Sequence, residues 1–159
     1  MQTYTPRLRE LTLTYRVRRD IAGDGICFGG CVTDADEAAR LLIAILADEP
    51  SEVFGMLCVT PRHRVIGYHE VSRGPLNASA VQPRDVFRVA ILANAAGVIL
   101  AHNRRCGDAT PSDDDLAIAR QLASAADIIS MAVLDYLEIA GDRHVSVRGT
   151  GRMSFDSGD

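Results

Sequence analysis

The sequence contains no lysine, so all 17 of its basic residues are arginine. The absence of lysine excludes lysine chemistry such as Schiff-base formation. No apolar run approaches the roughly 20 residues that a membrane-spanning helix needs. The first residues, MQTYTPRLRELTLTYRVRRD, lack the apolar core of a signal peptide. We therefore expect a cytoplasmic protein with no membrane association.

Cysteine is scarce, and its four copies do not form a recognisable metal-binding framework. A cytosolic setting keeps such thiols reduced. Cys27 and Cys31 bracket CFGGC, but no second pair follows at zinc-ribbon spacing, so both are interpreted as small apolar residues. The segment GDGICFGGC has no preceding strand and no phosphate-loop lysine, which excludes a nucleotide-binding loop.

Excess positive charge is also lacking, since the formal net charge is −4. This value argues against nucleic-acid binding as the dominant activity. Arginines nevertheless gather near the start of the chain, between Arg7 and Arg19. We interpret them as the charged face of a solvated strand, with a phosphate-binding arm as the alternative.

What the sequence does contain is an alternation of strand and helix patterns over 159 residues, which fits one domain. The prediction is a single-domain α/β fold with a mixed β-sheet flanked by helices. We divide the chain into an N-terminal strand and Gly-rich loop (1–30), the α/β domain (31–150) and a flexible tail (151–159). Strands are predicted at 11–17, 52–60, 65–72, 97–102, 131–139 and 144–148; helices are predicted from the N-cap Thr33 to before Pro50, over 83–94, and after the N-cap Ser112.

The segment ILAHNRRCGDATPSDDD, residues 99–115, carries the candidate chemistry. His102 closes a buried strand and Asp115 lies one turn into the next helix, so the loop between them can bring both to one metal ion. Glu52, at the start of another strand, is a candidate general base. Each residue also has a structural interpretation: Ser112 and Asp115 form a helix cap, His102 is a buried histidine, and Glu52 lies at the surface.

From Glu52 to Arg148 the chain resembles the RadC-like branch of the JAB/MPN/JAMM metallopeptidase fold. The resemblance rests on EVFGMLCVTPRHRVIGYHEVSRGPLNASAVQPRDVFRVAILANAAGVILAHN, followed in order by GDATPSDDD, LDYLEIAG and SVR. It implies a layered architecture like that of the cytidine deaminases. The metal signature of this fold is His-x-His, seven residues, Ser, two residues, Asp. His102, Ser112 and Asp115 fill their positions in that signature.

The resemblance further implies a zinc ion held by two histidines and the aspartate, with a water as fourth ligand. Glu52, with Glu70 as the fallback, would activate this water to attack a peptide or isopeptide bond, and Ser112 would stabilise the oxyanion. The name of the RadC branch suggests DNA repair, a role that the fold does not establish. RadC-type proteins also carry an N-terminal helix-hairpin-helix region, which we expect this chain to lack.

The signature is broken at its second histidine, where this chain has Arg104. A guanidinium has no lone pair to offer and cannot act as a normal zinc ligand. We hypothesise that Arg104 pairs with Asp115 and Glu52 in the space of the metal. The alternative is that the thiolate of Cys106 replaces the lost imidazole.

Two classes of function follow from the broken signature. The first is a catalytically degenerate RadC-like domain, a pseudoenzyme without bound zinc that serves as a binding or accessory module. Its partner would be a protein or peptide, with nucleic acid less well supported and a homodimer plausible. The second is an active zinc hydrolase that uses His102, Asp115, Ser112 and Glu52.

Overall fold

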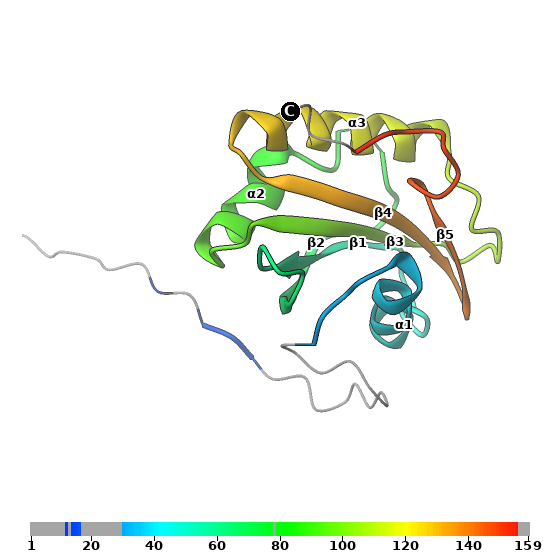
Figure 1. Ribbon diagram of the computed structural model, residues 1–159. Helices are drawn as coiled ribbons and strands as arrows, with labels where there is room; N and C mark the ends of the chain where they lie inside the picture. Colours follow the sequence, from blue (N-terminus) through cyan, green and yellow to red (C-terminus); the bar gives the residue numbers. More distant parts are fainter. Residues whose placement is uncertain (1–11, 13, 17–29, 78, 156–159) are drawn as a thin grey trace, which may run out of the picture.

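The computed structural model describes residues 12, 14–16, 30–77 and 79–155 (Figure 1). The strand predicted at 11–17 falls largely outside these residues, and the described ones among them have no regular secondary structure. In chain order the elements are α1 (Ala35–Leu46), β1 (Val53–Val59), β2 (Val65–Arg73), α2 (Pro83–Leu92), β3 (Gly97–Asn103), α3 (Asp113–Ile128), β4 (Ala132–Ala140) and β5 (Arg143–Ser146).

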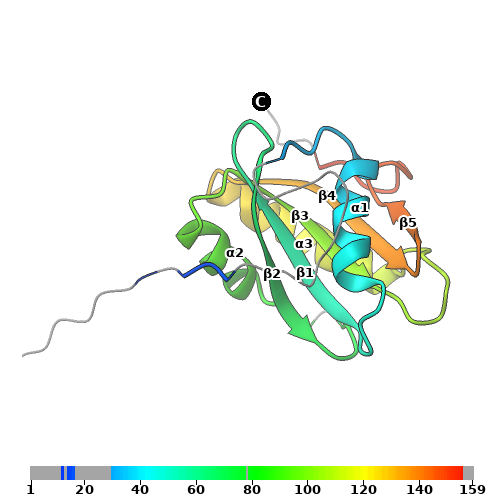
Figure 2. The same cartoon turned by 90° about the horizontal axis from the view of Figure 1, so that it is seen from below.

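The strands form one mixed sheet in the order β2-β1-β3-β4-β5. Only β3 and β4 run parallel, and the other neighbouring pairs are antiparallel. Helix α1 covers one face, while α2 and α3 cover the other (Figures 1 and 2). This arrangement confirms the predicted α/β class with a mixed sheet and flanking helices.

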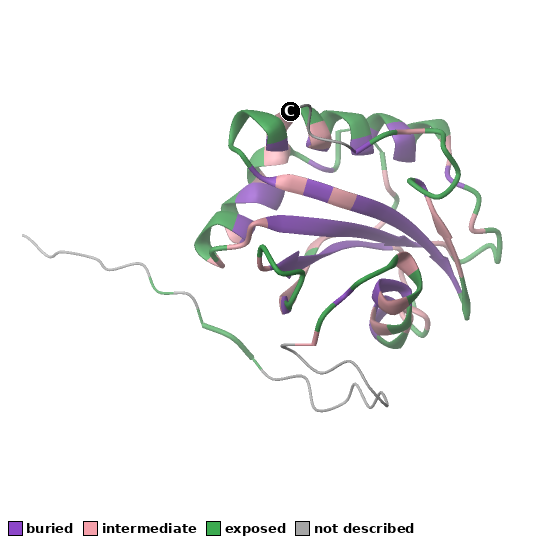
Figure 3. Cartoon of the chain, viewed as in Figure 1, coloured by how far each residue is buried: buried purple, intermediate pink, exposed green. Residues whose placement is uncertain are grey.

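The two helical layers explain the burial of the central strands (Figure 3). Every residue of β1 and β3 is buried, as expected for strands with both faces covered. One apolar cluster packs α2 and α3 on the sheet, and the other packs α1 on the opposite face. Along β3, Leu100 belongs to the first cluster and Ala101 to the second, so His102 faces α3.

The helix starts show how local chemistry sets the element boundaries. Helix α3 begins after Ser112, as predicted, and α2 has Pro83 in its first turn. The predicted N-cap of α1 is wrong by one residue, because the cap is Asp34, whose carboxylate accepts from the Glu37 N–H at 2.8 Å. Thr33 instead donates its N–H and hydroxyl to the Glu37 carboxylate.

Two further observations bear on expectations from the sequence. Phe155, within the tail expected to be flexible, is buried in the cluster under α2 and α3, with 8% of its surface exposed. Among the described residues, no helix has both the length and the apolar character that crossing a membrane requires.

The cap of α1 gives a first prediction. Replacing Asp34 with alanine is expected to lower the free energy of unfolding by about 1 kcal/mol, because the Glu37 N–H loses its acceptor. Urea denaturation followed by circular dichroism measures the change. The matched control is Asp48→Ala, an exposed aspartate beyond the end of α1, which should change stability by less than about 0.5 kcal/mol. Equal losses in both variants would contradict the assignment of the cap.

A candidate charged site between the parallel strands and α3

The parallel pairing of β3 and β4 places His102 directly beside Glu138. Helix α3 packs over this end of the pair and contributes Asp115 from its first turn. All three side chains are buried, and one ligand-type atom from each lies within 4.8 Å of the others. The fold therefore joins a histidine and two carboxylates from three separate elements in one buried cluster.

Arg104 follows β3 and brings a cation to this cluster. Its Nη2 donates to Asp115 Oδ2, and its Nε donates to Glu138 Oε2 at 3.1 Å. Its backbone N–H donates to the Ile139 carbonyl at 2.6 Å, which fixes the chain just beyond the end of β3. The side chain is 20% exposed, so the guanidinium closes the cluster at its outer side. One cation thus bridges two carboxylates that come from α3 and β4.

Asp115 is held by a full set of hydrogen bonds. The backbone N–H and the hydroxyl of Ser112 each donate to Oδ2 at 2.6 Å. The Tyr136 hydroxyl donates to Oδ1 at 3.1 Å, and the Asp115 N–H in turn donates to the Ser112 hydroxyl. Ser112 and Asp115 therefore do form the capping pair that their spacing allows, and the same carboxylate also pairs with Arg104.

His102 is less well satisfied than its neighbours. Its Nδ1 lies 3.3 Å from Glu138 Oε2 and 3.6 Å from Asp115 Oδ1. Neither ring nitrogen has a hydrogen-bond partner within the described part of the chain, and neither does Glu138 Oε1. Buried polar atoms without partners are uncommon and point to a site that was shaped for a ligand.

The two carboxyl groups are shifted in opposite directions. At Asp115 burial opposes ionisation, but hydrogen bonds from Ser112 and the Arg104 guanidinium outweigh it and lower the pKa. At Glu138 burial dominates and raises the pKa, with only partial opposition from His102 and Arg104. Desolvation lowers the pKa of Arg104, but Asp115 and Glu138 overcome this effect and raise it above its usual value. Arg104 therefore remains a cation, and Asp115 is the more strongly ionised of its partners.

The donor set can be tested against the zinc ion that the resemblance implies. In number it suffices, since catalytic zinc sites use three protein ligands and the cluster offers His102, Asp115 and Glu138. The guanidinium of Arg104, however, already occupies one oxygen of each carboxylate. A divalent ion beside it would face a fixed positive charge at close range. With Arg104 in this position, the residues do not fit a zinc ion.

The other residues predicted for the site lie outside the cluster. Glu52 is half-buried just before β1, and Arg104 pairs with Glu138 rather than with Glu52 among the described contacts. Glu70 pairs with Arg73 at the surface. Cys106 is exposed, with its Sγ 3.8 Å from the Asp108 carbonyl, and does not belong to the group of potential metal ligands.

Glu138 was missed in the sequence, although it left a trace there. It stands in the run LDYLEIA, where its neighbours on both sides are apolar. A charged residue within a buried strand is rare unless it is paired. That signal marks Glu138 as unusual, but only the register of β3 against β4 identifies His102 as its neighbour.

Asn103 anchors the opposite face of the same strand end. Its side-chain oxygen accepts from the Val53 N–H at 2.5 Å, and its amide donates to the Ser51 carbonyl at 3.0 Å. These bonds tie the end of β3 to the connection between α1 and β1. The backbone that carries His102 and Arg104 is therefore fixed from both faces of the sheet.

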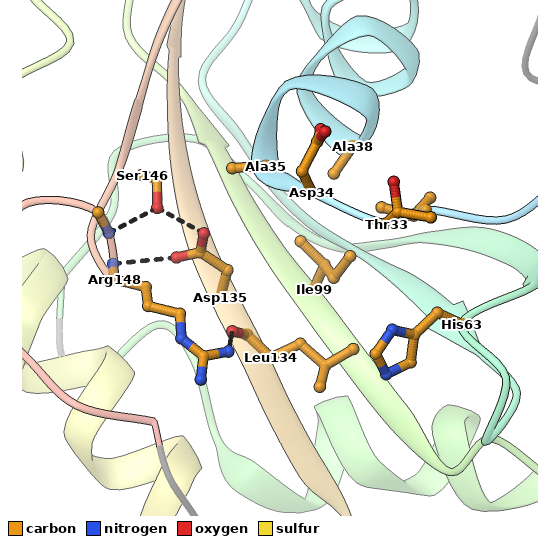
Figure 4. Close-up of a pocket in the computed structure, with 12 residues that line it drawn as sticks. Thr33, Asp34, Ala35, Ala38, His63, Ile99, Leu134, Asp135, Ser146 and Arg148 are labelled. Carbon is orange, nitrogen blue, oxygen red and sulfur yellow. Dashed lines mark hydrogen bonds between the residues drawn. The ribbon is translucent and has the colours of Figure 1, made fainter.

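A separate cavity of about 330 Å³ lies on the α1 face of the sheet (Figure 4). Its lining includes Asp135, whose carboxylate accepts from the N–H groups of Tyr136 and Arg148 and from the Ser146 hydroxyl. These bonds satisfy both oxygens of Asp135 and link β4 to the turn after β5. The cavity does not contain any residue of the His102 cluster.

The mixed sheet, with His102 at the end of β3 and Asp115 at the start of α3, defines a JAB-type α/β domain. Comparison with known families matches residues 32–152 to the RadC-like JAB domain. The chain therefore belongs to the RadC-like JAB domain family, as the sequence predicted.

Three relatives illustrate this membership. A UPF0758 protein of Thioalkalivibrio sulfidiphilus is 39% identical over 144 residues, which cover 91% of this chain and 64% of the relative. A UPF0758 protein of Alcanivorax borkumensis is 43% identical over 118 residues, covering 74% and 53% respectively. A UPF0758 protein of Cupriavidus pinatubonensis is 47% identical over 102 residues, covering 64% and 43%. The chain thus spans between 43% and 64% of the length of these relatives.

The hydrogen bonds to Asp115 generate a pH prediction. Because the folded pKa of Asp115 is lowered, its stabilising contribution is present above the unfolded pKa near 3.8 and is lost as the pH falls through the folded value. Ser112→Ala removes one donor, so the onset of acid unfolding should move to higher pH. At neutral pH the lost cap should cost about 0.5–2 kcal/mol.

Urea denaturation at a series of pH values from neutral to strongly acidic measures both effects. Ser124→Ala, at an exposed position in the middle of α3, is the matched control and should keep the acid limb of the wild-type curve. An unshifted acid limb in Ser112→Ala would contradict the assigned role of Ser112.

Proposed function

We propose that this domain is a RadC-like JAB domain without metallopeptidase activity, which serves as a metal-independent binding or accessory module for a protein partner. The observation that carries the proposal is the Arg104 guanidinium on the carboxylates of Asp115 and Glu138. It takes the position of a metal-binding imidazole and satisfies the acidic residues that a zinc ion would need.

The residues proposed for catalysis also lack the arrangement that hydrolysis needs. Glu52 would have to lie beside an activated water, whereas the carboxylate that contacts His102 and Arg104 belongs to Glu138. The Ser112 hydroxyl donates to Asp115 and caps α3, which commits it to a structural hydrogen bond. These contacts support a binding role over a hydrolytic one.

The test is elemental analysis of protein purified without chelator, together with an assay on peptide and isopeptide substrates. The expected result is a zinc content far below one ion per chain and no hydrolysis above background. Arg104→His restores the second histidine and is expected to raise the zinc content towards one per chain. Stoichiometric zinc in the wild type, with hydrolysis that Glu52→Gln abolishes, would instead establish the zinc hydrolase.

The surface offers a site for a protein partner at one end of the domain. Ile91 and Leu92 at the end of α2, and Ile128 and Ile129 at the end of α3, are large exposed apolar residues. The two helix ends lie at the same end of the sheet, since the N–H of Ala132 donates to the Ala96 carbonyl. Adjacent exposed apolar residues favour protein contact over nucleic-acid contact, as does the net charge of −4.

A second copy of the chain is the first partner to test at this surface. Ile128→Asp places a charge on the most exposed of these residues and is expected to abolish self-association seen in the wild type by sedimentation velocity at rising concentration. Ala117→Asp, at an exposed position near the start of α3, is the matched control and should associate as the wild type does. Monomeric behaviour of all three proteins would exclude the second copy as partner.

A further inference from the structure

We infer that the Arg104 guanidinium substitutes for a divalent cation in a latent metal site made by His102, Asp115 and Glu138, so that removing Arg104 alone opens this site to zinc. The inference rests on the proposed function and extends it. It assigns Glu138, which lies outside the His-x-His, Ser and Asp signature, as the counter-charge of Arg104 and as the third potential ligand.

The first step in the argument is the set of atoms without partners. His102 is 4% exposed, its ring nitrogens form no hydrogen bond within the described residues, and its Nδ1 points at both carboxylates. The Nδ1–oxygen distances of 3.3 and 3.6 Å are close to the spacing between two ligands of one tetrahedral zinc ion, which is about 3.3 Å for bonds of about 2.0 Å. Glu138 Oε1 is likewise buried without a partner.

The second step is the charge balance. Two buried carboxylates within 4.8 Å of one imidazole nitrogen need a cation, because isolated buried charges are strongly disfavoured. Arg104 supplies that cation through separate nitrogens, Nη2 to Asp115 and Nε to Glu138. A divalent ion bound to the same carboxylates would supply it equally well. Arg104 and a metal ion are therefore alternative occupants of the same electrostatic site.

The third step is the mechanical role of the cation. Asp115 belongs to α3, Glu138 to β4 and Arg104 to the segment after β3. The bridge of Arg104 thus holds the helix against the ends of the parallel strands, a task that a metal ion would otherwise perform. Loss of the bridge leaves the two carboxylates adjacent and uncompensated, so the domain should become dependent on an added cation.

The experiment compares Zn²⁺ binding and thermal unfolding of the full chain in the wild type, Arg104→Met, Glu138→Leu and the double variant. Methionine keeps a long side chain but adds neither a charge nor a strong zinc ligand, so any gained site must use residues already present. Arg105→Met is the matched control, because it removes an equal charge from the exposed neighbouring position.

Arg104→Met is expected to bind one Zn²⁺ per chain, at least roughly 100-fold more tightly than the wild type, since removal of a unit charge about 4 Å away strongly favours the ion. Its melting temperature should fall in chelator and recover with Zn²⁺. Both the binding and the recovery should disappear when Glu138→Leu is added. The wild type and Arg105→Met should respond to Zn²⁺ alike and weakly.

Zinc binding by Arg104→Met no tighter than by the wild type would overturn the inference, as would binding that persists in the double variant. If Arg104→Met is unfolded in chelator, refolding on addition of Zn²⁺ supports the inference and failure to refold rejects it. The proposed function is judged on the wild type alone, by its zinc content and hydrolysis. A failure of one proposal is therefore distinguishable from a failure of the other.

Discussion

A charge that cannot be neutralised at physiological pH governs the candidate site. Arg104 remains protonated, and its planar guanidinium offers separate N–H groups to Asp115 and to Glu138. Because both carboxylates are buried, their ionised forms depend on this cation and on the donors around them. The position of α3 over the sheet, the ionisation of Asp115 and the poor fit to zinc all follow from this one interaction.

Much of the fold could be predicted from local sequence patterns. Ser112 with Asp115 and Pro83 mark helix starts whose chemistry acts over a few residues, and the structure places both starts as predicted. The cap of α1 was misplaced because Thr33 and Asp34 are both good N-caps, and the pattern alone does not choose between them. The burial of Phe155 could not be foreseen, since a single aromatic residue in a polar tail has no periodic neighbours to reveal its contacts.

The site was predictable only as far as its residues lie in one continuous motif. His102, Arg104 and Asp115 occur within 14 positions, from 102 to 115, so their spacing indicates that they converge. Glu138 joins them through the register of a parallel strand pair that is separated by all of α3. Such pairing depends on the whole sheet, and for this reason Glu52 was expected beside Arg104 where Glu138 stands.

The adjacency of His102 and Glu138 across β3 and β4 also constrains how the chain can vary. A glutamate introduced at position 138 without an arginine at 104 would add an acid with no counter-ion to an apolar strand. An arginine introduced without the glutamate would lose one of its two anionic partners. The two positions are therefore coupled and should change together among homologous domains, so that each residue is tolerated mainly in the presence of the other.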